Sequence, residues 1–426
     1  MTTPGSKATM PRILCIMGSG ETAPTMVSVH ADLIARMGPQ PVPAVLLDTP
    51  FGFQENADDI SQRAMAFFRD NVGHAISVAT YRNRETATPL EYETMLARVG
   101  EARYVFAGPG SPTYALQQWR ESALPKVLGA KLREGGCVTF ASAAAVGLGP
   151  YALTVYEVYK VGEPPRWLEG LDLLSATGLR AAVIPHYNNA EGGTHDTRYC
   201  YMGERRLRAL EEMLPDDVAI LGVDEHTACI FDLGAGEATI RGRGAVTWRH
   251  HGGSKRFESG SVLPIEALAG DVSNAGAAAV PQPAAAVEQA EPAPGASPFL
   301  EELEKHEASA DQALAGRDVD ATVAAALAID AQMHDWAADT FDSDEQDRAR
   351  ETLRRIVVRL GDVARDGAAD PRERIAPVVD RVLDLRKQMR TEGQYALADR
   401  LRDLLVDAGI EVRDSPDGST WHLNGD

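Results

Sequence analysis

The sequence has little cysteine. Its 426 residues include four, Cys15, Cys137, Cys200 and Cys229, and no two of them form a C-x-x-C pair. This scarcity argues against a disulfide framework and favours a reducing compartment. Long apolar runs are also missing: no segment approaches the roughly 18 uninterrupted apolar residues of a membrane span, and the N-terminal stretch does not resemble a signal peptide. We therefore expect a cytoplasmic chain with no membrane partner.

Positive charge is scarce as well. The 62 Asp and Glu residues outnumber the 42 Lys and Arg residues, which gives a formal net charge of −20. Such a chain repels polyanions on average, although a local basic patch can still bind one. The hydrophobic fraction of 44% is typical of globular proteins. A chain of this length exceeds one ordinary core and predicts two or three domains.

A change in composition divides the chain. Residues 266–297 are rich in alanine and proline with almost no large apolar side chains, which predicts a linker because the segment cannot offset its ordering entropy. Before it, residues 1–265 alternate short apolar runs with helical patterns. After it, residues 298–426 show helical spacing followed by a short hairpin across the sequence SPDGST.

The alternation in residues 1–265 predicts an α/β domain with a doubly wound, mostly parallel sheet. Later apolar runs, from residue 218 onward, are expected to extend this sheet or to cap its edge. The strands expected in the first part are residues 12–17, 42–48, 75–81, 103–108 and 136–142.

One serine stands where such a sheet can carry a nucleophile. In VTFASAAAVGLG, Ser142 follows a β-branched run and precedes a run of small residues. A strand that turns sharply into a helix exposes such a hydroxyl and places the next backbone N–H, that of Ala143, near the developing oxyanion. The alternative is a serine that only caps the helix.

A histidine and two acids follow at the ends of later strand-like runs. His186 comes after AAVIP and would reach the same edge as Ser142, where it could act as the base. Asp224 and Glu225 end a further run and could orient that base. The sequence leaves open which of the two acids does so.

Glycine turns and a polar loop complete the candidates. The turn with Gly18, Ser19 and Glu21 could hold an anion, and Gly110 and Ser111 could offer backbone donors to an oxyanion. His195 opens a loop with Asp196 that leads to an arginine-rich helix. A metal site of His186, His195, Asp196 and His226 is disfavoured because no compact ligand spacing appears.

Together GSGE, GPGSPTYAL, FASAAA, IPHYNN and GVDEHTA resemble the peptidase E (aspartyl dipeptidase) and cyanophycinase family, whose fold is that of class I glutamine amidotransferases. The resemblance implies a hydrolase that acts on small acidic peptides or isopeptides without cofactor or metal. It implies Ser142 as nucleophile, His186 as base and Glu225 as the orienting acid, with oxyanion donors from Gly110 and Ala143. The substrate-binding candidates are Gly18, Ser19, Glu21, Ser111, Asn188, His195 and Arg198.

The elbow departs from the family pattern G-x-S-A-G. Phe140 stands two residues before the serine and Ala144 two residues after it. We expect the phenylalanine to crowd the turn, and Ala144 to be strained if its φ is positive.

The end of the chain resembles a different family. Residues 382–426, approximately, which include ADRLRDLL, AGI and DSPDGSTW, are similar to the C-terminus of bacterial cysteinyl-tRNA synthetases, whose catalytic signatures are absent here.

The two resemblances lead to three candidate functions: a serine hydrolase acting on a small peptide or amino-acid-derived substrate, a catalytically inactive sensor of such molecules, or a protein that binds tRNA through its C-terminal domain. The sequence leaves the oligomeric state open, with a homodimer as one candidate.

Overall fold

The computed structural model describes residues 10–190, 195–269, 297–316, 318–336, 345–368, 371–415 and 418–423. The chain packs as two compact units. The first comprises Met1–Leu303 and Asp330–Asp347, and the second comprises Glu304–Ile329 and Arg348–Asp426. Most of the expected linker, residues 270–296, lies outside the described residues. Residues 266–269, the first part of the expected linker, are described. Leu268 among them is fully buried in the core of the first unit, so that unit extends past residue 265.

The main sheet of the first unit has eight strands in the order β14-β11-β10-β1-β5-β4-β2-β3. From β1 to β3 all neighbours are parallel, while β10, β11 and β14 add antiparallel strands at the other side. The strands are β1 (Arg12–Met17), β2 (Ala44–Leu47), β3 (Ser77–Ala79), β4 (Tyr104–Ala107), β5 (Gly136–Ala141), β10 (Thr227–Asp232), β11 (Glu237–Gly242) and β14 (Val262–Pro264).

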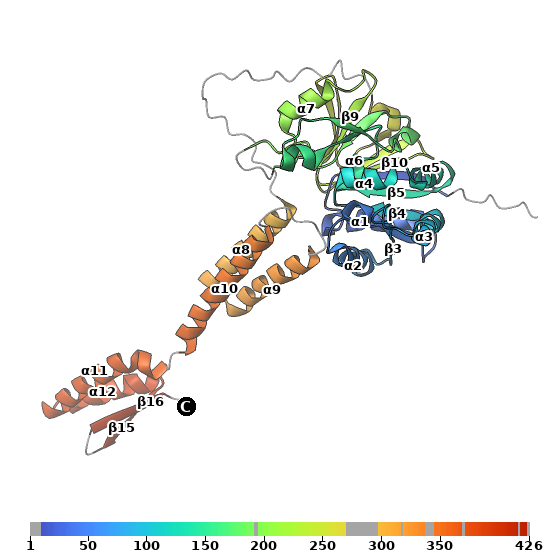
Figure 1. Ribbon diagram of the computed structural model, residues 1–426. Helices are drawn as coiled ribbons and strands as arrows, with labels where there is room; N and C mark the ends of the chain where they lie inside the picture. The colour runs from blue at the N-terminus through green and yellow to red at the C-terminus, as the bar shows by residue number, and fades with distance from the viewer. Residues whose placement is uncertain are drawn as a thin grey trace, which may run out of the picture. The chain divides into compact units, whose positions relative to one another are not determined.

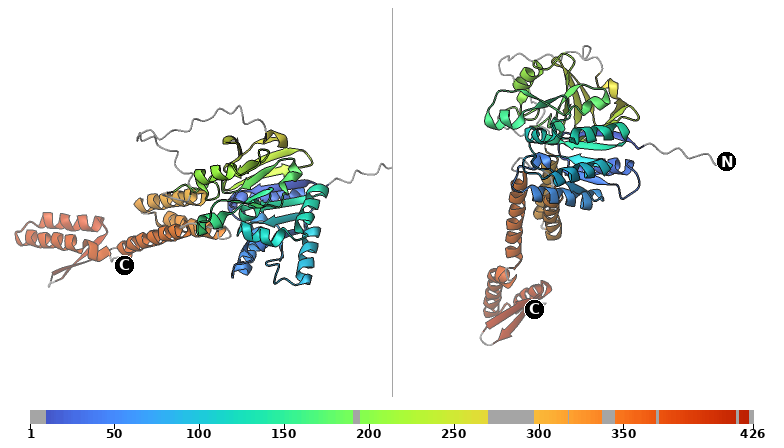
Figure 2. Two further views of the ribbon diagram at one scale, coloured as in Figure 1. Left: turned by 45° about the horizontal axis from the view of Figure 1, so that its top comes forward. Right: turned by 45° about the vertical axis from the view of Figure 1, so that its right-hand side comes forward.

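Helices cover both faces of this sheet (Figures 1 and 2). Successive residues of a strand point to opposite faces, and β1 shows the result. Leu14 and Ile16 join one buried cluster, which includes residues of α3 and α5, whereas Ile13 and Cys15 join the other, which includes residues of α1 and α2. The doubly wound, mostly parallel sheet is therefore confirmed. The α-helices of residues 10–269, whichever sheet they pack on, are α1 (Val27–Arg36), α2 (Ala57–Phe67), α3 (Pro89–Glu101), α4 (Pro112–Trp119), α5 (Leu124–Glu134), α6 (Ser142–Val146) and α7 (Gly203–Glu211).

The runs from residue 218 onward, expected to extend the first sheet or to cap its edge, are divided: some extend it, and others form a second sheet together with residues 181–184. Its order is β13-β12-β9-β8, with β8 and β9 parallel and the other neighbours antiparallel. Figure 2 shows these green and yellow strands beside the main sheet. The strands that precede His186 and Glu225 thus belong to a sheet separate from the strand that precedes Ser142. They are β8 (Ala181–Ile184), β9 (Ala219–Val223), β12 (Ala245–His250) and β13 (Gly253–Glu258).

The C-terminal region is helical and ends in an antiparallel hairpin, as expected. In the second unit, Val379 and Leu383 of α11 pack with Leu405 of α12 and with Ile410 and Val412 of the hairpin. No described helix of the chain is long and apolar enough to cross a membrane. The elements are α8 (Pro298–Ala315), α9 (Val319–Asp335), α10 (Glu345–Ala368), α11 (Pro371–Thr391), α12 (Tyr395–Asp407), β15 (Ile410–Ser415) and β16 (Gly418–Leu423).

Candidate active site

Ser142 lies at a sharp turn between β5 and α6. Its backbone adopts φ 46°, a left-handed conformation that costs a non-glycine residue roughly 1–3 kcal/mol. A nucleophile held between a strand and a helix adopts such strained backbone, which exposes its hydroxyl above the sheet edge. The geometry therefore separates Ser142 from an ordinary helix-capping serine, and no side-chain cap is formed at this helix.

The two residues that replace the glycines do not obstruct this turn. Phe140 is completely buried in the core beneath the sheet, where its ring lies 5.6 Å from that of Trp119. Ala144 is absent from the described residues that have a positive φ, and its N–H donates to the carbonyl of Gly108 at 3.2 Å. The expected crowding is therefore wrong, because the phenylalanine side chain packs into the core and only Ser142 takes the left-handed conformation.

His186 follows β8 and reaches the serine. Its Nε2 lies 2.9 Å from Ser142 Oγ. Its backbone is also left-handed, at φ 48°, and its N–H donates to the carbonyl of Gly18 at 3.3 Å. Although β8 and β5 belong to different sheets, the turn after β8 delivers the imidazole to the end of β5.

Glu225 follows β9 and contacts the other side of the imidazole. Its Oε1 lies 2.9 Å from His186 Nδ1. An ionised carboxylate only accepts hydrogen bonds, so Nδ1 carries the proton and Nε2 is left to accept from the hydroxyl of Ser142. Asp224 is directed elsewhere: it is buried and accepts from the backbone N–H of Ala245. The structure thus brings Glu225, and not Asp224, to His186.

The surroundings of Glu225 keep it ionised. Burial raises the pKa of its carboxyl, but the hydrogen bonds from His186 and Asn189 outweigh that effect, so the pKa lies below its ordinary value. Asn189 is fully buried and donates from Nδ2 to Glu225 Oε1 at 3.2 Å. Asn188 accepts the backbone N–H of Glu225 at 2.7 Å. The PHYNN segment therefore carries the imidazole together with two residues that position the acid.

The oxyanion candidates lie on the same cavity as Ser142 and His186. Gly110 has φ 136°, and a Cβ there would stand 2.0 Å from the carbonyl oxygen of Pro50, so only glycine fits. Among the described residues, neither the N–H of Gly110 nor that of Ala143 donates a hydrogen bond. Both groups are therefore available to a developing negative charge.

The cavity has a volume of about 720 Å³, which suits a small substrate. Its walls come from the segment before α2, from the start of α2, from the turn before α4 and from residues flanking β6 (Tyr151–Leu153) and α7. Its lining residues include Phe53, Ile60, Arg63, Gly110, Ser111, Ser142, Ala143, Val155, Tyr156, His186 and Tyr201.

The GSGE turn lies behind the site and does not line this cavity. A Cβ on Gly18 would stand 2.0 Å from the carbonyl oxygen of Asp224, and one on Gly20 would stand 2.1 Å from the imidazole of His226. Ser19 Oγ accepts the N–H of His226 at 3.4 Å, and Glu21 is buried. The turn thus supports the loop that carries Glu225.

Of the remaining substrate-binding candidates, Ser111 lines the cavity, whereas Arg198 and His195 do not. Ser111 lines the cavity and caps α4, where its Oγ accepts the N–H of Tyr114. Arg198 does not line it, and its guanidinium is held by Asp196 through two hydrogen bonds of 2.9 Å. This arrangement holds the pKa of Asp196 at about 2. His195 is exposed near the ring of Tyr159, at a centroid distance of 6.3 Å.

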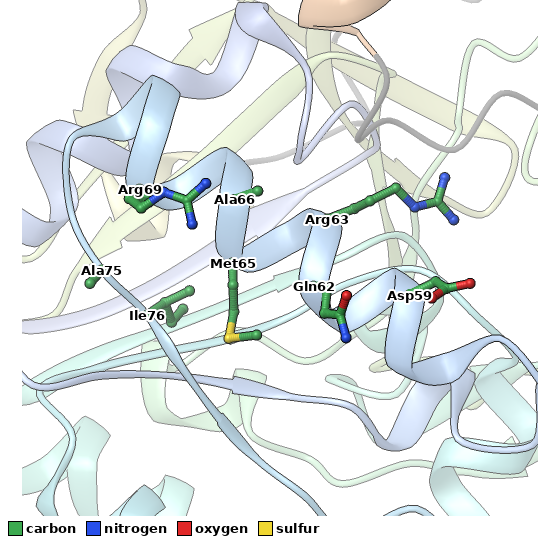
Figure 3. A pocket seen from close by; sticks show the side chains of 8 residues that line it. All are labelled: Asp59, Gln62, Arg63, Met65, Ala66, Arg69, Ala75 and Ile76. Carbon is green, nitrogen blue, oxygen red and sulfur yellow. The ribbon is translucent and has the colours of Figure 1, made fainter.

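A second groove runs along α2 and the start of β3, lined by Met65, Arg69 and Ile76 among others (Figure 3). Its described lining contains no histidine, serine or cysteine, and Arg69 there is paired with Asp70. No group of His, Cys, Asp or Glu side chains that could hold a metal ion occurs in the part of the chain that the structure describes.

Sequence reasoning missed the role of Asn189 and the aromatic wall of the cavity. Asn189 follows Asn188 directly, and only the fold shows which of the two amides reaches the carboxylate. Phe53 lies in a turn and Tyr156 at the start of a short helical segment, and neither position belongs to a motif.

No family model matches the chain. A peptidase from an acI-B1 actinobacterium, known from its crystal structure, superposes on 60% of this chain and 97% of its own, at 20% identity and a TM-score of 0.49. The C-terminal region matches cysteine–tRNA ligases: that of Salinibacter ruber is 34% identical over 115 residues, and that of Thermoplasma acidophilum is 48% identical over 48 residues. These matches cover 24% and 11% of this chain, and the chain spans only 22% and 11% of the two ligases. The solved structures similar to the N-terminal part of the chain include this peptidase and a putative peptidase E protein from Listeria monocytogenes, which superposes on 55% of this chain and 98% of its own at 13% identity and a TM-score of 0.37. The two resemblances seen in the sequence, to peptidase E-type proteins and to cysteine–tRNA ligases, are thus the ones that the comparisons find.

Proposed function

We propose that the chain is a serine hydrolase that cleaves an amide bond in a small peptide or isopeptide. The observation that carries this proposal is the continuous relay from Ser142 Oγ to His186 Nε2, at 2.9 Å, and from His186 Nδ1 to Glu225 Oε1, also at 2.9 Å. These distances allow proton transfer without rearrangement. The strained backbone of Ser142 and the two open N–H groups beside it supply the other parts that acyl transfer needs.

In the first half of the reaction, Ser142 Oγ forms a bond to the carbonyl carbon of the substrate. Its proton passes to His186 Nε2, and the carbonyl electron pair moves onto oxygen, which accepts from the N–H groups of Gly110 and Ala143. Glu225 stabilises the imidazolium through Nδ1. His186 then gives the proton to the amide nitrogen, the C–N bond breaks, and a free amine leaves an acyl-serine.

In the second half, water takes the place of the amine. His186 accepts a proton from water as the water oxygen bonds to the acyl carbon, and the oxyanion forms again at the same donors. When it collapses, the bond to Ser142 Oγ breaks and His186 returns the proton to that oxygen. A carboxylic acid is released, and no step consumes a cofactor.

Hydrolysis of a dipeptide panel, followed by the release of free amino acids, tests this proposal. Ser142→Ala and His186→Ala should each lower kcat by at least about a thousandfold, and Glu225→Gln by at least about a hundredfold. Ser175→Ala, an exposed serine outside the cavity, is the matched control and should leave the rate unchanged. A folded wild-type chain that binds such peptides without cleaving them would instead identify a sensor.

A second candidate concerns the C-terminal region alone. We propose that residues 298–426 contact tRNA, and the support is their similarity to part of the cysteine–tRNA ligases. A gel shift with total tRNA at about 150 mM salt tests it, since non-specific binding by an acidic chain weakens steeply with salt. The shift should be present for the full chain and lost when residues after Ser297 are deleted. No shift at any salt concentration would remove this candidate.

A further inference from the structure

The cavity beside Ser142 has an aromatic wall. Among the described residues, the exposed large aromatic side chains are Phe53, Tyr156 and Tyr395, and the first two line this cavity. Phe53 is 52% exposed and Tyr156 is 38% exposed. An exposed aromatic ring beside a reactive serine has apolar surface that a ligand can cover. Tyr201, Val155 and Ile60 add further apolar lining.

The segment that carries Phe53 is held firmly. Asp48 at its start is fully buried and accepts from Arg82 Nε at 2.8 Å. The carbonyl of Pro50 accepts the N–H of Ser111, in the turn that contains Gly110. The Phe53 ring lies 5.1 Å from that of Tyr114. The aromatic wall and the oxyanion turn are therefore parts of one fixed structure, so a side chain packed on this wall is placed relative to Ser142.

One positively charged side chain, that of Arg63, lies among the described lining residues of the cavity. Among the described residues that line it there is no aspartate or glutamate, and Arg63 on α2 is the one with a permanent charge. Arg63 makes no hydrogen bond or ion pair with the residues that the structure describes. Arg63 also lines the groove along α2, where Figure 3 shows its side chain extending away from Met65 and Arg69. By contrast, Arg198 is held by Asp196.

We propose, on the basis of the hydrolase function above, that the preferred substrate is a small peptide with an aromatic side chain and a free carboxylate. The aromatic group packs against Phe53 and Tyr156, and the carboxylate binds Arg63. An acidic side chain cannot cover the aromatic surface, and its carboxylate meets a cavity whose described lining offers a single permanent cation, Arg63. The cavity therefore selects aromatic peptides over acidic ones.

The test measures kcat/KM for matched dipeptides: Phe-Leu, Leu-Phe, Asp-Leu, Leu-Asp and the C-terminal amide of Leu-Phe. The better aromatic dipeptide should exceed both acidic ones by about tenfold or more, the size expected for one well-buried aromatic contact. Phe53→Ala should raise KM for that dipeptide by about fivefold to tenfold with little change in kcat. Arg63→Gln should remove the preference for the free carboxylate over the amide.

Two exposed side chains outside the cavity serve as matched controls: Leu90, which is 76% exposed, for Phe53, and Arg69, paired with Asp70, for Arg63. Leu90→Ala and Arg69→Gln should behave as wild type, and the unfolding midpoint of each variant checks its fold.

A preference for Asp-Leu or Leu-Asp, or a preference for aromatic dipeptides that survives Phe53→Ala, would overturn the substrate assignment and leave the hydrolase in place. Absence of hydrolysis for the whole panel, together with no reaction of Ser142 with a fluorophosphonate, would overturn the proposed function and this inference with it. Reaction of Ser142 without any dipeptide hydrolysis would overturn the inference alone.

Discussion

The amide nitrogen of Asn189 and the ring nitrogen of His186 share one acceptor, Oε1 of Glu225, at 3.2 Å and 2.9 Å. Asn189 also donates its backbone N–H to the carbonyl of His186 at 3.2 Å, so a single buried residue contacts both partners of the pair. The carboxylate is thereby fixed in position and in charge before a substrate arrives.

Asn189→Ala is therefore expected to reduce kcat by about tenfold while KM stays nearly constant, because one hydrogen bond to a charged group is lost and no substrate contact changes. Steady-state kinetics on the best dipeptide measure this split. Asn71→Ala, at an exposed position outside the site, is the control. An increase in KM with unchanged kcat would show that Asn189 contacts substrate instead of positioning Glu225.

Gly110→Ala is expected to destabilise the chain and abolish activity. The new Cβ would stand 2.0 Å from the carbonyl oxygen of Pro50 in backbone at φ 136°, and we expect a loss of about 3 kcal/mol in the free energy of unfolding. Gly162→Ala is the matched control, since it also has a positive φ, 86°, but nothing within 4 Å; it should cost only about 1 kcal/mol. Chemical denaturation compares the two, and equal losses would contradict the close packing at Gly110.

His30 makes the stability of the first unit depend on pH. It is fully buried, Nε2 donates to the carbonyl of Glu21 at 2.6 Å, and Nδ1 accepts from Tyr104. Burial lowers the pKa of His30 from 6.5 to about 4. The unfolded chain therefore binds this proton below pH 6.5 while the folded chain does not, so stability falls as the pH decreases from 6.5 to about 4.

The contribution is about 3 kcal/mol across that interval, from roughly 1.4 kcal/mol for each pKa unit. His30→Gln has no group that titrates there, and its free energy of unfolding should change less between pH 7 and pH 4.5 than that of wild type. Denaturant titrations at both pH values provide the comparison. Identical pH slopes for the two proteins would show that His30 has an ordinary pKa.

The second unit contains an ion pair with one buried partner, Arg386, and one partly exposed partner, Asp414. Arg386, whose side chain is 2% exposed, donates from Nη1 and Nη2 to the two oxygens of Asp414 at 2.6 Å and 2.8 Å. Asp414→Ala should cost about 2 kcal/mol, because the buried guanidinium loses its charged partner and keeps, among the described residues, only the carbonyl of Ala398 and the hydroxyl of Ser419. Hydrogen exchange of α11 and β15 should report the loss. Glu411→Ala, which removes an exposed partner of Arg413, should cost less than about 1 kcal/mol, and protection equal in both variants would contradict the importance of the pair of Arg386 with Asp414.

Much of the first unit could be predicted from its sequence, because its strands are short apolar runs at regular intervals. The run RILCIM coincides with β1, and the run expected at residues 136–142 contains β5 and exceeds it by Ser142, which begins α6. The division into two sheets could not be predicted, because β8 and β9 have the same apolar composition as the strands of the main sheet. Strand pairing depends on contacts far apart in the sequence, as between Ile184 and Gly222.

At the candidate site, too, the positions of some residues could be predicted from the sequence, whereas the directions of their side chains could not. Ser142 and His186 could be identified because each follows an apolar run, although the expectation that both runs end at one edge of the same sheet was wrong, since β5 and β8 belong to different sheets. The choice between Asp224 and Glu225 could not be made, since neighbouring residues point in different directions only once the backbone is known. The effect of Phe140 was misjudged for that reason: its side chain faces the core next to Trp119.

The most direct test of the account is reaction of the full chain with a small fluorophosphonate, followed by mass spectrometry of the peptides. The relay at Ser142 predicts one adduct per chain, located on Ser142, that forms readily in wild type and disappears in Ser142→Ala. In His186→Ala it should form at least about a hundredfold more slowly, because the hydroxyl has lost its base. A folded wild-type chain that gives no adduct, or an adduct on Ser142 whose rate does not depend on His186, would contradict the assignment of Ser142 as an activated nucleophile.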